Sequence, residues 1–128
     1  MPTPALTKNA ADRDAVQTAR RLEQKRQLRF AAALKAVLAT PEGREVLSAV
    51  IERAGVFESV YDHSGSTMYF KEGRRNYGLE WQAAMIGADE AAYEVLERER
   101  RARRRLEDAE TTALHTARAI TEEEQSHE

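Results

Sequence analysis

Residues 64–96 read SGSTMYFKEGRRNYGLEWQAAMIGADEAAYEVL and carry most of what distinguishes this chain. They hold the single tryptophan, three of the four tyrosines and four of the six glycines, whereas Ala, Arg, Glu and Leu dominate the remainder. Phe70, Tyr77 and Trp81 recur at helical spacing and predict a helix over residues 67–86. We expect this aromatic stripe to belong to a core rather than to a binding site.

Two glycines inside that helix need a structural reason, because Gly in a helix interior costs about 1 kcal/mol relative to Ala. We expect another helix or loop to approach closely at Gly73 and Gly78. Between them, Arg74, Arg75 and Asn76 are either surface groups or donors to the carbonyl end of the preceding helix. The full structural signature comprises Gly73, Arg74, Arg75, Asn76, Tyr77, Gly78, Trp81, Asp89 and Tyr93.

Capping residues mark further helix ends on both sides of this stretch. Thr40 followed by Pro41 predicts the start of a helix over residues 41–54, and Gly55 predicts its end. The other expected caps are Ser66 or Thr67 at the start of the aromatic helix, Gly87 at its end, and Asp89 before a helix over residues 90–121.

The outer parts of the chain are strongly charged. Residues 12–39 contain neither Gly nor Pro and predict a long helix whose second half enters the core. We therefore predict an all-α fold, with a small helical core at about 30–96 and long charged N- and C-terminal helices. The single helical domain is expected over residues 12–121, between a disordered arm (residues 1–11) and an acidic tail (residues 122–128). A small core with long arms favours a homo-oligomer, and the long helices could pair within one chain or between subunits.

A run of arginines follows the core in the last helix, and these are the candidate interaction residues. From residue 97 to residue 105 only Ala102 is apolar, so this section is a solvated helix, an arginine-bearing interface or a break. Arginines on a helix can neutralise phosphates, which makes nucleic acid a possible partner. The simpler interpretation is intrahelical pairing of Glu97 with Arg101 and of Glu99 with Arg103, or contact with the acidic tail. The run comprises Arg98, Arg100, Arg101, Arg103, Arg104 and Arg105.

The sequence lacks the patterns of the common catalytic and metal sites. The chain has no cysteine, and its three histidines share no ligand spacing, so we expect no cofactor and no metal. No nucleophile–histidine–acid pattern or phosphate-binding glycine loop occurs, and we predict that the protein is not an enzyme. No apolar stretch approaches the roughly 20 residues that span a bilayer, and no secretory signal is apparent, so we expect no membrane partner.

Several blocks of the chain resemble a known family. The blocks TPEGREVL, ERAGVFES, FKEGRRNYGLEW and ADEAAYEVLERE, between about residues 30 and 99, resemble a family of small proteins of short-tailed phages first described in a Bordetella phage. That family is encoded near portal and capsid genes. The resemblance implies a virion-associated or virion-assembly role through contacts with portal, scaffold or capsid, in the virion or the host cytoplasm. A nucleic-acid-binding module and a host-directed phage protein are the alternatives. Both charged arms lie outside the similar region.

Overall fold

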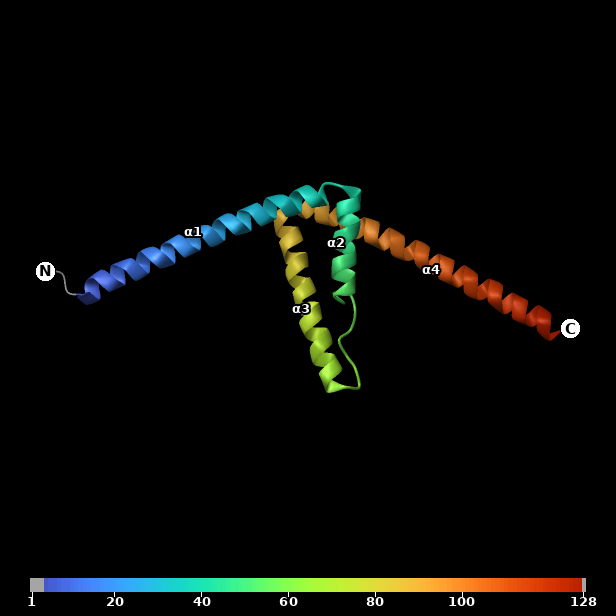
Figure 1. The fold of residues 1–128 in the computed structure, drawn as a ribbon. Coiled ribbons are helices and arrows are strands. Elements are labelled where there is room, and N and C mark those ends of the chain that lie inside the picture. The colour runs from blue at the N-terminus through green and yellow to red at the C-terminus, as the bar shows by residue number, and fades with distance from the viewer. Residues whose placement is uncertain (1–3, 128) are drawn as a thin grey trace.

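The computed structural model describes residues 4–127 and contains four helices and no strand in that range (Figure 1). These are α1 (Pro4–Leu38), α2 (Pro41–Arg53), α3 (Gly65–Ala88) and α4 (Glu90–Ser126). The predicted all-α fold with long N- and C-terminal helices is confirmed.

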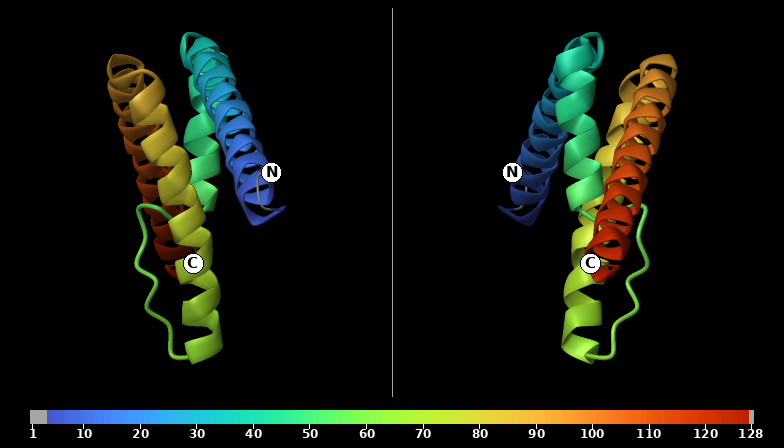
Figure 2. Two further views of the ribbon diagram at one scale, coloured as in Figure 1. Left: turned by 90° about the vertical axis from the view of Figure 1, so that its left-hand side faces the viewer. Right: turned by 90° about the vertical axis from the view of Figure 1, so that its right-hand side faces the viewer.

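Two helices form a short stem and the other two form arms. α2 and α3 lie side by side and point the same way from the junction, while the free parts of α1 and α4 project in opposite directions (Figure 1). The views along the arms show α1 and α4 on separate sides of the stem (Figure 2). Within the described residues, the two arms therefore do not pair with each other, and the acidic end of α4 does not fold back onto the arginine run.

The core lies where all four helices meet. Its apolar side chains come from the last turns of α1, from α2 and the residues after it, from the end of α3 and from the first turns of α4. They are Leu34, Leu38, Leu47, Ile51, Ala54, Val56, Met85, Tyr93 and Leu96. All of these side chains lie between residues 34 and 96.

Three of the predicted caps are confirmed. The Thr40 hydroxyl accepts a hydrogen bond from the backbone N–H of Gly43 at 3.0 Å, and Pro41 opens α2. Gly55 has a φ of 77°, a left-handed conformation that ends α2 and turns the chain away. Asp89 accepts from the N–H of Ala92 at 3.1 Å and caps α4.

Several helix ends differ from the prediction. α1 begins at Pro4, so residues 4–11 of the expected disordered arm are helical, and the rest of that arm lies outside the described residues. Pro is tolerated in a first turn, and no helix breaker follows it before Leu38. Ser64, rather than Ser66 or Thr67, caps α3. Gly87 lies inside α3, because the extended backbone of Asp89 ends that helix directly after Ala88.

The acidic end of the chain also differs from the expected separate tail. α4 continues to Ser126, so most of residues 122–128 extend the helix, and the last residue lies outside the described range. Good helix formers fill this segment and no Gly or Pro interrupts it, which explains the continuation.

Candidate protein-binding surface

Two arginines of the run at residues 98–105 make contacts with other parts of the same chain. The Nη2 of Arg103 donates a hydrogen bond to the hydroxyl of buried Ser48 on α2 at 2.8 Å. The guanidinium of Arg100 lies over the ring of Phe57, 3.7 Å from its centroid, in the connection after α2. The sequence left a solvated helix, an arginine-bearing interface or a break as alternatives for residues 97–105. In the structure α4 is continuous here, and its arginines form an interface with α2 and with the residues after it.

An ion pair fixes the same crossing one turn away. The Nε and Nη2 of Arg44 donate to the carboxylate of Glu99 at 2.9–3.2 Å, and its Nη1 donates to the carbonyl of Leu38 at 3.0 Å. These hydrogen bonds lower the pKa of Glu99 and raise the pKa of Arg44. The predicted Glu99–Arg103 pair is wrong, because Glu99 binds Arg44 and Arg103 binds Ser48.

Sequence reasoning missed this pair because the partners are 55 residues apart. One signal was present: Arg44 and Ser48 are separated by four residues, as are Glu99 and Arg103. Residues four apart share a helix face, so α2 and α4 each carry a polar pair with the same spacing, and the two pairs can contact each other.

A second polar cluster surrounds Glu97 on α4. Its carboxylate accepts from the hydroxyl of Tyr93 at 3.3 Å and from Arg100 at 3.1 Å, and Arg101 lies at 3.7 Å. The predicted Glu97–Arg101 pair is thus confirmed. The amide of Gln82 on α3 donates to the Tyr93 hydroxyl at 2.6 Å, and burial raises the pKa of Tyr93. Tyr93 therefore joins the apolar core to this polar cluster.

The remaining arginines of the run face solvent. Arg98, Arg101 and Arg105 follow the spacing i, i+3 and i+7, which places them on one face of α4, away from α2. Arg104 is also exposed and lies 3.6 Å from Asp108. The six candidate interaction residues thus divide into two that hold the fold and four that are available to a partner.

The two glycines of α3 have different surroundings. A Cβ at Gly78 would lie 2.5 Å from the Cβ of Ala54 and 2.6 Å from a methyl of Val56, so the expected close approach is confirmed there. A Cβ at Gly73 would meet nothing within 4 Å among the described residues. The expected approach at Gly73 is therefore wrong within one chain, and Gly73 sits on an open surface.

Among the described residues, the polar side chains between these glycines are not hydrogen-bonded to α2, although the Nη2 of Arg74 reaches to 3.7 Å from where a Cβ at Gly55 would lie. The guanidinium of Arg74 lies 5.7 Å from the centroid of the Phe70 ring. Arg75 is half-buried and Asn76 is exposed. Within residues 4–127 no hydrogen bond joins these three side chains to the carbonyl end of α2, so the surface alternative is the one observed.

The aromatic stripe is mostly exposed, which corrects the prediction that it belongs to the core. Phe70 and Tyr77 are 68% and 61% exposed, and only Trp81 is half-buried, edge-on against Phe30 of α1 with ring centroids 5.8 Å apart. Phe70 is uncovered because α3, with 24 residues, extends beyond α2, which has 13 (Figure 1). Tyr77 is level with the end of α2, which packs on the neighbouring Gly78, but Tyr77 lies on the flank toward Phe30 of α1, where it lines an open groove. We call the surface formed by Phe30, Phe70, Gly73, Tyr77 and Trp81 the α3 aromatic face.

A shallow groove of about 230 Å³ lies at the inner end of this face. Phe30, Tyr77, Glu80, Trp81 and Ala84 line it. It is open and largely apolar, with one carboxylate at its edge. Such a lining suits an apolar side chain of a partner and contains no acid–base pair for chemistry.

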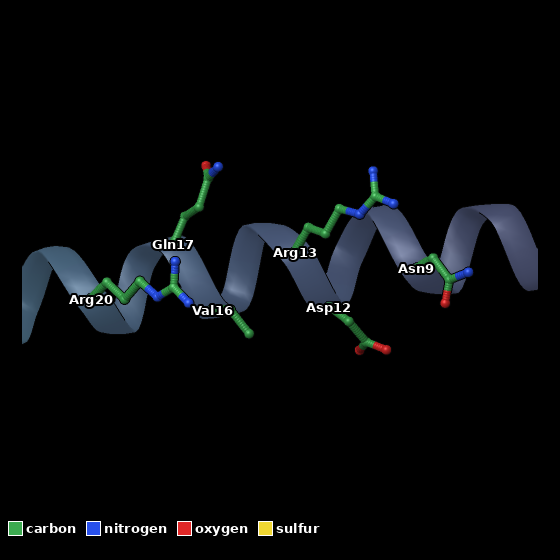
Figure 3. A pocket seen from close by; sticks show the side chains of 6 residues that line it. All are labelled: Asn9, Asp12, Arg13, Val16, Gln17 and Arg20. Atoms are coloured by element: carbon green, nitrogen blue, oxygen red, sulfur yellow. The ribbon is translucent and has the colours of Figure 1, made fainter.

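A second hollow lies along α1 and does not form a closed site. Asn9, Asp12, Arg13, Val16, Gln17 and Arg20 line it, all from successive turns of one helix. In Figure 3 the side chains of Arg13 and Gln17 point to one side of the helix and that of Asp12 to the other. Its lining comes from α1 alone, without an opposite wall, so these residues form a helix surface rather than a pocket.

Metal-binding and membrane-spanning features are both missing from the described range. Residues 4–127 contain no cluster of three or more side chains suited to hold a metal ion. No helix in this range is both long and apolar enough to cross a membrane.

Comparison with known proteins gives one family match. Residues 34–98 match the family described as Bbp19-like phage protein. The match begins at the first core residue of α1 and ends two residues after the last core residue of α4. It therefore covers the junction, the stem and the α3 aromatic face except Phe30, and it leaves both projecting arms outside. No curated protein and no solved structure matches the chain.

Proposed function

The chain belongs to the Bbp19-like phage protein family, and we propose that it is a virion-associated or virion-assembly protein that acts by binding other particle proteins. The portal, the scaffold or the capsid is the intended partner, and binding rather than catalysis is the activity. The protein would accordingly be found in virions or, during assembly, in the host cytoplasm.

One observation carries this proposal: the α3 aromatic face is exposed and lies almost entirely in the family-matched part of the chain. Aromatic side chains are enriched at protein interfaces, and buried ones supply much of the binding energy. Gly73 lies between Phe70 and Tyr77 with open space above it. A helical glycine without a contact in its own chain lowers stability, whereas it would let the backbone of a partner approach closely.

Mutation of this face tests the role directly. In phage carrying a tagged gene, we expect wild-type protein to co-purify with virions or pro-particles, as measured by mass spectrometry of both. For the double variant Phe70→Ser/Tyr77→Ser, the amount that co-purifies with particles should fall at least tenfold, because both substitutions remove apolar contact with the partner. Tyr61→Ser is the matched control, since Tyr61 is a similarly exposed tyrosine but lies in the connection before α3, outside the α3 aromatic face.

Two results would overturn the proposal. The wild-type protein could be absent from both kinds of particle, which would favour the host-directed alternative. Alternatively, the Phe70→Ser/Tyr77→Ser variant could associate with particles as well as the wild type and the Tyr61→Ser control do. Presence in pro-particles but not in virions would identify a temporary assembly factor.

Nucleic-acid binding is a second candidate, favoured by the outward alignment of Arg98, Arg101 and Arg105. It predicts retention on DNA at low salt with a steep salt dependence. The triple substitution of these arginines by Gln should weaken binding and reduce the salt slope, while leaving the contacts of Arg100 and Arg103 intact. Absence of retention at low salt would rule this candidate out.

A further inference from the structure

The outer half of α4 carries an apolar stripe that no other described residue covers. The residues of the stripe are all exposed and recur at helical spacing beyond the stem: Leu106, Ala109, Ala113, Ala117 and Ile120. Leu106 is 66% exposed and Ile120 is 52% exposed, although each is large and apolar. This part of α4 projects freely from the stem (Figure 1). An exposed helix gains little stability alone, so such a stripe indicates a packing partner.

The stripe is symmetric about Ala113. Counting from Ala113, apolar residues stand four and seven positions away in both directions. When two copies of α4 cross antiparallel with a two-fold axis at Ala113, Leu106 of one copy meets Ile120 of the other, and Ala109 meets Ala117. A two-fold contact requires a self-complementary surface of this kind. The three alanines allow the two helices to approach closely.

The charges of α4 also fit an antiparallel arrangement. Arg105 and Glu123 are eighteen residues apart, five whole turns, so both lie on the same flank of the stripe. In the antiparallel pair, Arg105 of each copy would lie beside Glu123 of the other. More broadly, the basic run at residues 98–105 would lie beside the acidic end of the second helix. A parallel pair would instead place like charges together, which is unfavourable.

We propose that α4 is a self-association site, which pairs with α4 of a second copy as an antiparallel helix pair centred on Ala113. The stripe lies outside the family-matched region, so this inference is independent of the role in the particle. Its occupant is a second copy of this chain, because the stripe and the charges of α4 are complementary to themselves. The dimer would present two stems, and hence two α3 aromatic faces, at a fixed separation.

Cysteine cross-linking of the full chain tests the register. The chain has no native cysteine, so single substitutions give clean disulfides. Ala113→Cys should cross-link with itself. Ala109→Cys and Ala117→Cys should each remain uncross-linked alone, because identical positions would be offset by about 12 Å along the axis. An equimolar mixture of these two variants should form the mixed disulfide, identified by a mass tag on one of them.

The strength of dimerisation in solution can be compared between charge-reversal variants and a variant of the apolar stripe. By analytical ultracentrifugation, Arg105→Glu and Glu123→Arg should each weaken the dimer about tenfold, since each disturbs two symmetric pairs, and the double variant should restore it. Leu106→Gln should weaken the dimer by at least tenfold, whereas Leu28→Gln should not. Leu28 is the matched control because it is a similarly exposed leucine on α1.

Three outcomes would overturn the inference. The wild type could be monomeric at every concentration tested. The Ala109→Cys and Ala117→Cys variants could each cross-link alone, which would indicate a parallel pair. The dimer could also be insensitive to Leu106→Gln and to both charge reversals, which would place self-association on another surface.

Discussion

Replacing Gly78 by alanine should destabilise the junction, whereas the same replacement at Gly73 should stabilise it. Both glycines lie inside α3, so alanine gains about 1 kcal/mol of helix preference at either position. At Gly78 the new Cβ would lie 2.5 Å from the Cβ of Ala54 and 2.6 Å from a methyl of Val56. Carbon atoms pack at about 3.5–4.0 Å, and the Cβ of Ala54 cannot rotate away because it is fixed to the backbone.

The cost of overpacking and the gain in helix preference oppose each other and together determine the change in the free energy of unfolding. Overpacking a core contact costs typically 1–3 kcal/mol, and with the gain in helix preference we expect Gly78→Ala to lower the free energy of unfolding by about 1 kcal/mol. The new methyl group of Gly73→Ala has no such close contact, so this variant should raise the free energy of unfolding by about 1 kcal/mol. The two variants should therefore differ by about 2 kcal/mol, although each adds one methyl group to the same helix.

Urea unfolding followed by the fluorescence of Trp81 measures this difference. Trp81 packs on Phe30 beside the core, so its signal reports the junction rather than the projecting arms. The midpoint should fall for Gly78→Ala and rise for Gly73→Ala, at an unchanged slope. A midpoint for Gly78→Ala at or above that of the wild type would refute the reasoning from close contact.

Further substitutions test the polar crossing, the cap and the core. Glu99→Gln should lower the urea midpoint at neutral pH. Because the pKa of Glu99 is lowered in the folded protein, its contribution is present above the ordinary pKa of about 4.3 and is lost as the pH falls through the folded value, so wild type and variant should converge in acid. Asp89→Ala should cost about 1 kcal/mol by removing the cap of α4, and Asp89→Asn should restore most of it. Leu38→Ala, at a fully buried side chain, should cost about 2–5 kcal/mol in the same assay.

The sequence alone determined the helical class, several helix ends and the family. Thr40–Pro41, Gly55 and Asp89 act through hydrogen bonds and backbone angles within a few residues, so their effects could be predicted without knowing what packs against them. The close contact at Gly78 was also predictable, because a glycine inside a helix lowers its stability and commonly marks a position where a neighbour leaves no room for a side chain. The blocks between about residues 30 and 99 sufficed to place the chain in a phage family, and the match over residues 34–98 confirms this.

Only the tertiary structure decided which polar and aromatic groups are free. The contacts of Arg44 with Glu99 and of Ser48 with Arg103 depend on how α2 crosses α4. The spacing of residues within each helix does not determine this crossing geometry. The same crossing divides the arginine run into half-buried members that contact α2 and the residues after it, and exposed members. The aromatic stripe of α3 has the spacing of a core face, but burial also requires a neighbour: α2 ends before it reaches Phe70, and beside Tyr77 the end of α2 packs on Gly78 instead. Local spacing determines which residues share a face, whereas the lengths and crossings of the neighbouring helices determine whether that face is covered.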